Sequence, residues 1–216
     1  MEQYYSQFGQ DKFIIENIFK KMTDGFFVDI GAGDGVHISN TYALEKQYNW
    51  TGVCVECNSI SYDNLIKNRS CKFYNKPITE KGGVVEFNQI DNFGYHTTLF
   101  SSIYEVPVEF KSNAKKIKLQ SATIDDFLDE INAPNMIHYL SLDIEGGEYE
   151  ILESFFANHN LKNNWTREII SLSVEHNFDE IKRNKIKNLL ESNLYTRAAC
   201  LDVDDIYIHK LFEINI

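Results

Sequence analysis

Two short segments place acidic and imidazole side chains directly after apolar runs. The first, SLDIEGGE, contains Asp143 and Glu145, and the second, SVEHN, contains Glu175 and His176. The runs before them predict two buried strands, and parallel strands bring their carboxyl ends to the same edge of a sheet. We therefore expect these side chains to converge. Carboxylates with an imidazole suit Mg²⁺ or Mn²⁺, and the predicted ligands are Asp143, Glu175 and His176.

The same residues also suit proton transfer without a metal. An unperturbed imidazole has a pKa of about 6.5, close to neutrality, so His176 can act as a general base, as can a carboxylate such as Asp143. We predict Asp143, His176 and Glu145 as catalytic residues. A structural interpretation stays open, in which Glu145 and Glu148 favour a helix N-terminus and His176 is a hydrogen-bonded core residue.

A second candidate site is the segment FFVDIGAGDG at positions 26–35. An apolar run that enters a glycine-rich turn is typical of nucleotide sites, because glycines permit tight turns and a following helix presents free N–H groups. The G-x-G-x-G spacing departs from the G-x-G-x-x-G of dinucleotide binders, and Asp29 and Asp34 would repel a pyrophosphate. A ligand with a cationic amine and a sulfonium fits these acids, which describes S-adenosylmethionine.

A further carboxylate stands at the end of the next predicted strand, where Glu56 closes the segment VCVE. A carboxylate in this position can accept hydrogen bonds from both hydroxyls of a ribose. The glycine stretch and Glu56 together indicate an adenosine-containing cofactor. For Glu56 alone, the alternative is an acid at a strand end that faces solvent.

Strand and helix patterns alternate along the chain, and this order must position the candidate residues. Apolar stripes predict a helical segment within residues 1–25 and helices at 39–47, 59–67, from 123, at 148–156 and around 186–194. Strands are expected at 26–30, 51–56, 71–75, 84–90, 137–145, 168–176, 196–203 and 205–214. Residues 91–120 show no period and predict a variable loop or lid. The order indicates an α/β fold, with a mostly parallel sheet, helices on both faces and an antiparallel C-terminal edge pair.

Composition bounds the classes of function. The chain has 216 residues, 43% of them apolar, and a formal net charge of −11. This length favours one domain over residues 1–216. The negative charge argues against nucleic-acid partners. Without a signal-like segment or a long apolar run, we expect no membrane insertion and a cytoplasmic location. Cys54 and Cys57 have C-x-x-C spacing, but within a strand they are expected to be small buried thiols.

The chain resembles the FkbM-type S-adenosylmethionine-dependent methyltransferases in several segments that occur in the same order. These segments are YSQFGQDKFIIENIF, FFVDIGAGDG, SNTYALEKQYNWTGVCVECN, YLSLDIEGGEYEIL, VEHN and DDIYI, and they extend from Tyr5 to Ile208. The resemblance implies a Rossmann-like fold with a seven-stranded sheet. It also implies methylation of a hydroxyl on a sugar or natural product, which we narrow to a sugar of a glycan or glycolipid precursor.

The resemblance adds residues to the predicted cofactor site. Gln7 and Gln10, from SQFGQD, are expected to fold over the cofactor, Asn40 to face it, and the end of the third strand near Pro77 to hold the adenine. The predicted cofactor-binding residues are thus Gln10, Asp29, Gly31, Ala32, Gly33, Asp34, Gly35, Asn40, Glu56, Cys57, Asn58, Pro77 and Asp143.

For the acceptor, a sugar or glycan, the irregular segment offers aromatic stacking faces; the candidates are Tyr95, His96, Tyr104 and Phe110. Scattered surface aromatics account for them equally well. Other glycan-synthesis enzymes or domains are expected as partners. Two alternative functions stay open. One is an NAD-dependent oxidoreductase that uses the same loop and ribose carboxylate, and the other is a non-catalytic module that binds the cofactor or a glycan in a larger assembly.

Overall fold

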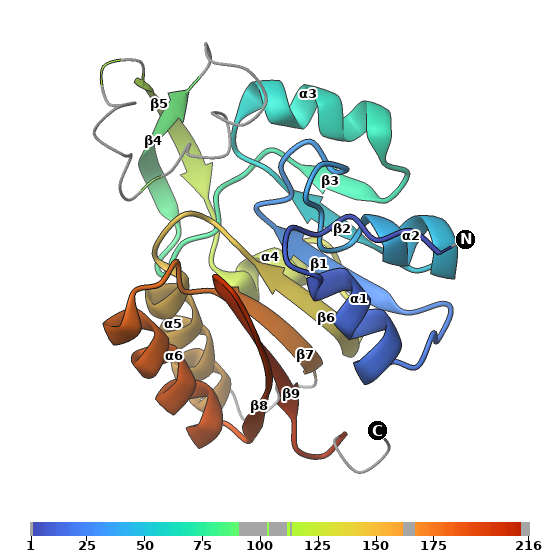
Figure 1. Ribbon diagram of the computed structural model, residues 1–216. Coiled ribbons are helices and arrows are strands. Elements are labelled where there is room, and N and C mark those ends of the chain that lie inside the picture. Colours follow the sequence, from blue (N-terminus) through green and yellow to red (C-terminus); the bar gives the residue numbers. More distant parts are fainter. Residues whose placement is uncertain (1, 91–102, 104–111, 113, 162–166, 213–216) are drawn as a thin grey trace.

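The computed structural model describes residues 2–90, 103, 112, 114–161 and 167–212. Seven strands form one sheet in the order β3-β2-β1-β6-β7-β9-β8 (Figure 1). Their bounds are β1 Phe26–Ile30, β2 Thr51–Val55, β3 Lys72–Tyr74, β6 Met136–Leu142, β7 Glu168–Glu175, β8 Tyr195–Leu201 and β9 Asp204–His209. The first five run parallel, whereas β9 is antiparallel to both β7 and β8. The predicted mostly parallel sheet with an antiparallel C-terminal pair is confirmed.

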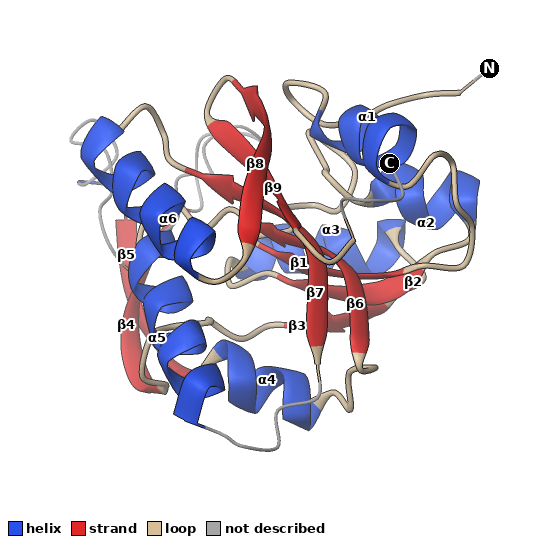
Figure 2. Cartoon of the chain, turned by 90° about the horizontal axis from the view of Figure 1, so that it is seen from below, coloured by secondary structure: helices blue, strands red, loops and turns tan. Residues whose placement is uncertain are grey.

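Helices cover both faces of this sheet, as expected (Figure 2). One face carries α1 Gln10–Phe13, which continues into the π-helical turn η1 Ile14–Ile18, together with α2 Tyr42–Tyr48 and α3 Ser59–Asn68. The other face carries α4 Ile124–Glu130, α5 Glu148–Leu161 and α6 Glu180–Ser192. Successive strand residues point to opposite faces. Phe27 therefore packs with the first group of helices, while Val28 and Ile30 pack with the second.

A second, two-stranded sheet lies outside the main one. It consists of the antiparallel strands β4 Gly83–Ile90 and β5 Ala114–Ser121. The expectation of an irregular segment over 91–120 is therefore wrong for residues 114–120, where exposed lysines conceal the alternation of a strand. The remainder of that segment, with the acceptor candidates Tyr95, His96, Tyr104 and Phe110, lies outside the described residues.

Several element boundaries differ from the sequence-based expectation. The helix predicted from residue 39 begins at Tyr42, because the Ser39 hydroxyl accepts hydrogen bonds from the Thr41 and Tyr42 N–H groups and holds that segment as a turn. The helix predicted to end at residue 156 continues to Leu161. None of the helices in the described part of the chain is both long and apolar enough to cross a membrane.

Candidate active site

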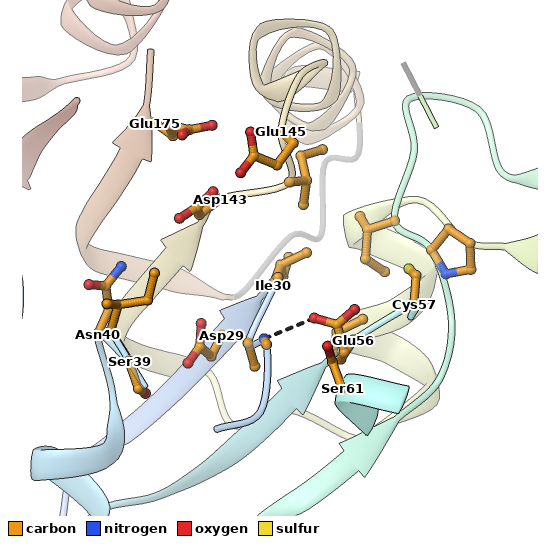
Figure 3. Close-up of a pocket in the computed structure, with 18 of the residues that line it drawn as sticks. Asp29, Ile30, Ser39, Asn40, Glu56, Cys57, Ser61, Asp143, Glu145 and Glu175 are labelled. Atoms are coloured by element: carbon orange, nitrogen blue, oxygen red, sulfur yellow. Dashed lines mark hydrogen bonds between the residues drawn. The ribbon is translucent and has the colours of Figure 1, made fainter. Parts of the chain in front are cut away.

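A cavity of about 240 Å³ lies at the carboxyl ends of β1, β2, β6 and β7 (Figure 3). The chain leaves β1 toward β2 on one side and returns later to place β6 on the other, so the strand order reverses at β1. Such a switch point is where open α/β sheets bind ligands. Three groups of residues line the cavity: the glycine loop after β1, an apolar end near β4, and an acidic end after β6 and β7.

The glycine loop is clamped between the two neighbouring strands. The N–H groups of Gly31 and Ala32 both donate to the Val55 carbonyl, at 2.9 and 3.0 Å. A Cβ at Gly31, whose φ is +91°, would stand 1.6 Å from the Asp143 carbonyl oxygen. Only glycine fits this position. The β6 backbone therefore approaches the glycine loop closely at Gly31.

Gly31, Ala32 and Gly33 line the cavity, whereas Asp34 and Gly35, also predicted to bind the cofactor, do not. The Asp34 carboxylate accepts hydrogen bonds from the N–H groups of Val36 and His37, at 2.9 and 2.8 Å. Gly35 gives room to the side chains of Leu65 and Arg69. These two residues therefore shape the loop, in the way that aspartate and glycine shape many turns.

Asp29 lies beneath the loop and belongs to a buried network around Arg69. The Thr41 hydroxyl donates to Asp29 at 2.5 Å and accepts from Arg69 at 3.0 Å. Arg69 also donates to the Gly35 carbonyl at 3.0 Å and to the Glu45 carboxylate at 2.5 Å. Burial raises the pKa of Asp29, and Arg69 opposes that shift. Asp29 lines the cavity, as predicted, and so does Asn40, which donates to the Ser141 hydroxyl at 3.0 Å.

Glu56 also lines the cavity and faces the glycine loop (Figure 3). Its two carboxylate oxygens accept hydrogen bonds from the N–H groups of Gly33 and Asn58, at 2.8 and 2.7 Å. Burial raises the pKa of Glu56 to about 7. A carboxylate has about four acceptor positions, so Glu56 keeps acceptor capacity for a ribose hydroxyl. The predicted Asn58 does not line the cavity, because its side chain caps α3 by accepting from the Ile60 and Ser61 N–H groups.

The apolar end consists of residues from four segments. They are Cys57, Pro77, Ile78, Phe87 and Ile103. Cys57 and Pro77, both predicted to bind the cofactor, line the cavity here. Phe87 was missed, since it comes from β4, outside the main sheet; the alternating pattern of that strand is the only signal that could have indicated it. Apolar and aromatic walls of this kind suit the adenine of a nucleotide.

The acidic end contains what we call the acidic cluster: Asp143, Glu145 and Glu175. One carboxylate oxygen from each lies within 4.8 Å of the others, and Figure 3 shows the three side chains turned toward one another. Burial and the neighbouring Glu175 raise the pKa of Asp143 well above its usual range. Burial, together with nearby acids, also raises the pKa of Glu175 to about 9 and that of Glu145 to about 7. Strongly shifted pKa values in a cleft are typical of functional sites.

Three charged residues lie around the acidic cluster: Glu148, Lys182 and Asp204. Glu148 accepts hydrogen bonds from the Ile144 and Gly146 N–H groups, at 3.2 and 2.9 Å, and pairs with Lys182 at 3.0 Å. Its role is to brace the loop at the start of α5, as the structural interpretation proposed. Asp204, which the sequence did not single out, pairs with Glu175 in the β7–β9 register and accepts from the Gln10 amide.

Gln10, a predicted cofactor ligand, is thereby turned away from the cavity, while Gln7 of the same segment lines it. An isolated bridge between Ser6 and Ile38 ties this segment to the loop after β1. The N-terminal segment therefore contributes one wall of the cavity through Gln7, and Gln10 supports the acidic end through Asp204.

His176 does not join the acidic cluster, which corrects its prediction as a metal ligand and catalytic base. It follows Glu175 directly, and successive residues of an extended chain point to opposite sides. With Glu175 directed into the cavity, His176 is buried on the other side, where its Nε2 lies 3.9 Å from Asp205. His176 is absent from the cavity wall, and Glu145 takes the place in the cluster that we predicted for His176.

Solved structures with a similar fold include two methyltransferases. The FkbM methyltransferase from Methylobacillus flagellatus KT has a TM-score of 0.53 and 14% identity, over 91% of this chain and 48% of that chain. The METTL16 MTase domain has a TM-score of 0.51 and 13% identity, over 93% of this chain and 66% of that chain. The chain thus spans about half of the first protein and two thirds of the second, and at these identities the likeness shows a shared fold.

The sequence also matches a family model. No curated protein matches it, but the model described as the methyltransferase FkbM domain matches residues 29–204. That range includes the glycine loop, Glu56 and the whole acidic cluster, and it confirms the resemblance noted in the sequence. The chain belongs to the FkbM family of S-adenosylmethionine-dependent methyltransferases.

Proposed function

We propose that this chain transfers the methyl group of S-adenosylmethionine to a hydroxyl of a sugar in a glycan or glycolipid precursor. Methyl transfer follows from the family. The single observation that supports an oxygen acceptor is the acidic cluster, because an alcohol must lose its proton to become a good nucleophile and carboxylates with raised pKa values can accept it.

The residues that line the cavity fit the methyl donor. The apolar end suits the adenine, and the Glu56 carboxylate offers its remaining acceptor capacity to a ribose hydroxyl. Asp29 and the backbone of Gly31 to Gly33 suit the methionine part, whose amine is cationic. Bound S-adenosylmethionine supplies a methyl group on a sulfonium, and its C–S bond breaks as the acceptor oxygen bonds to that carbon. The acidic cluster lies at the opposite end of the cavity from the apolar end. The acceptor would enter at the acidic end.

In this proposal the acidic cluster takes the hydroxyl proton during the transfer. Glu145, with a pKa of about 7, is poised between its two protonation states at neutral pH, which is where a general base is most effective. Asp143 stands between Gly31 and the other two acids and would position the acceptor hydroxyl.

A neutral, hydroxyl-rich acceptor is favoured by the charge and the remaining wall residues. The acidic cluster would repel an anionic acceptor at short range. The amide side chains of Gln7 and Asn177 also line the cavity, and amides can both donate to and accept from hydroxyl groups. A sugar satisfies both conditions. We infer the same class of acceptor from the family resemblance of the sequence.

The test is an assay of S-adenosylhomocysteine formation with a panel of neutral sugars, nucleotide sugars and glycolipids, followed by identification of the methylated atom. Formation of an O-methyl sugar, lost in Asp143→Asn and retained in the exposed control Glu150→Gln, is expected. A methylated nitrogen or carbon would contradict the oxygen acceptor. Hydride transfer with NAD would establish the oxidoreductase alternative, and binding of the methyl donor without turnover on any acceptor would favour a non-catalytic module.

A further inference from the structure

We propose that Asp143, Glu145 and Glu175 together form a binding site for one divalent cation, Mg²⁺ or Mn²⁺, at the acceptor end of the cavity. The catalytic use of this ion rests on the proposed function, whereas its binding does not. The ligand set differs from the sequence-based prediction, since Glu145 takes the place of His176.

The spacing of the three carboxylates suits one small ion. Mg²⁺ and Mn²⁺ ligands lie about 2 Å from the metal, so neighbouring ligand oxygens are separated by roughly 3–4 Å. One oxygen from each of the three side chains lies within 4.8 Å of the other two, a distance that small rotamer adjustments can close. The three residues come from the ends of β6 and β7 and from the loop between β6 and α5 (Figure 3).

The chemistry of the donors selects hard cations. All three ligands are carboxylates, and the imidazole of His176, next to Glu175 in sequence, is turned away from them. Oxygen-only sites prefer Mg²⁺, Ca²⁺ and Mn²⁺ over Zn²⁺ or Cu²⁺, which favour imidazole and thiolate. Three protein ligands are few for Ca²⁺, which takes six to eight oxygens, and they leave open positions on an octahedral Mg²⁺ or Mn²⁺.

An unsatisfied carboxylate oxygen gives independent support. Glu175 is only 6% exposed, and its Oε2 is buried without a hydrogen-bond partner among the described residues. Its side chain points at Asp143 and Glu145 (Figure 3). Buried polar atoms in native proteins are almost always paired, and a buried carboxylate needs a compensating charge. A cation between the three acids would supply both the partner and the charge.

The surrounding residues do not provide that compensation in full. Lys182 lies near enough to the cluster to lower the pKa values of Glu145 and Glu175, but its ion-pair partner is Glu148, at 3.0 Å. Glu148 in turn is bonded to the Ile144 and Gly146 N–H groups. On the far side stands another acid, Asp204, whose Oδ1 is also buried without a partner among the described residues. The cluster therefore holds more negative charge than its neighbours offset.

A bound ion would serve the proposed reaction in two ways. An acceptor hydroxyl could take an open coordination position, which would orient its oxygen toward the methyl group. A divalent cation also lowers the pKa of an oxygen that it binds, so that the proton passes to the nearby carboxylates more readily. The protein's contribution is to fix the three ligands, and Glu148 does this by bracing the loop that carries Glu145.

The deciding experiment is calorimetric titration of the metal-free full chain with MnCl₂ alone and with MgCl₂ alone. We expect one site per chain, weakened at least about tenfold in Asp143→Asn and in Glu175→Gln and unchanged in Glu150→Gln, an exposed acid on α5 that serves as a matched control. Thermal unfolding of each variant establishes that it is folded. Bound Mn²⁺ enhances the relaxation of water protons. This enhancement gives a second measure of binding that does not depend on the heat of titration.

Absence of saturable binding to the wild-type chain would overturn the proposal, as would equal binding by Glu175→Gln and Glu150→Gln, which would indicate non-specific attraction to an acidic protein. The assay of sugar methylation separates this proposal from the proposed function. Mn²⁺ binding through Glu175 without methylation of any sugar would support the cation site and contradict the function. Full methylation after chelation, with no Mn²⁺ bound, would support the function and contradict the cation site.

Discussion

Two groups of buried acids lie on either side of β1, and their surroundings are opposite. On the β2 side, Glu45 pairs with Arg69; burial alone would raise the pKa of this acid, but the arginine lowers it to about 2. On the β6 side, burial and neighbouring acids raise the pKa of Glu175 to about 9. One group is neutralised by a fixed guanidinium, whereas Lys182 compensates the other only in part, so its acids hold their protons to higher pH.

The difference distinguishes residues that support the fold from residues that take part in the reaction. The Arg69 network satisfies its own hydrogen bonds, holds the glycine loop through the Gly35 carbonyl and places Asp29 at the base of the cavity. In the acidic cluster, the buried Glu175 Oε2 has no hydrogen-bond partner among the described residues, which costs stability unless a proton or cation occupies the site. Proteins retain arrangements of that kind at functional sites. Changes in the first group should therefore affect folding, and changes in the second should affect turnover.

The largest effect on stability is expected for Arg69→Met. The substitution keeps much of the side-chain volume but leaves Glu45 and Asp29 buried without their cation, and breaking a buried pair in this way costs roughly 3–5 kcal/mol. Urea denaturation measures the loss. Lys116→Met, which removes an exposed pair with Glu86, is the control and should cost less than about 1 kcal/mol. Equal losses in the two variants would show that the Arg69 network is not the scaffold described above.

For Asp143→Asn we expect a loss of turnover without a loss of stability. Turnover should fall by about 100-fold or more, the usual contribution of a positioned acid or base. Stability should stay the same or rise, because the change removes one acid from a group of like charges. Turnover and urea denaturation are measured on the same preparation. A clear loss of stability together with turnover would indicate that Asp143 is mainly a structural residue.

The sequence predicts those parts of the two groups that depend on residues close together in the chain. It does not predict the parts that depend on contacts between distant segments. The strand ends that carry Glu56, Asp143 and Glu175 were placed correctly, because apolar periodicity and glycine turns are local signals. The direction of a side chain is less secure, since a shift of one residue along a strand reverses its face. His176 illustrates this: it adjoins Glu175 in sequence and lies on the opposite side of the chain.

Contacts between distant segments could not be read from the sequence. Asp204 reaches the acidic cluster through the antiparallel pairing of β9 with β7, and Arg69 reaches the glycine loop from the end of α3. Neither position has a local pattern that marks it. For the same reason, the sequence predicts a glycine turn after the first strand, but the atom that requires glycine at position 31, the Asp143 carbonyl oxygen, could be named only from the fold.

A smaller effect on stability is expected when low pH protonates Glu45 and breaks its pair with Arg69. The folded pKa of Glu45, about 2, lies below its ordinary value of 4.5, so the folded state binds this proton less tightly than the unfolded state. The pair therefore stabilises the fold fully above about pH 4.5, and roughly 2–3 kcal/mol is lost as the pH falls toward 2. Urea denaturation between pH 7 and pH 3 follows the loss. The dependence should be weaker in Glu45→Gln and in Arg69→Met; an unchanged slope in both would assign it to other groups.

The smallest effect concerns Glu56, which follows β2 and faces the glycine loop. Its carboxylate already accepts from Gly33 and Asn58, and in Glu56→Gln the loss of charge should weaken S-adenosylhomocysteine binding by about tenfold, close to the value of one charge-assisted hydrogen bond. Because the pKa of Glu56 is about 7 and the charged form binds the ribose, wild-type affinity should fall from pH 8 to pH 6. Titrations at both pH values measure the ratio for wild type, Glu56→Gln and the control Glu150→Gln. The ligand's own amine titrates equally in all three, so the part of the pH dependence that belongs to Glu56 is the part that Glu56→Gln loses. Identical pH dependence in wild type and Glu56→Gln would mean that the ribose is held elsewhere.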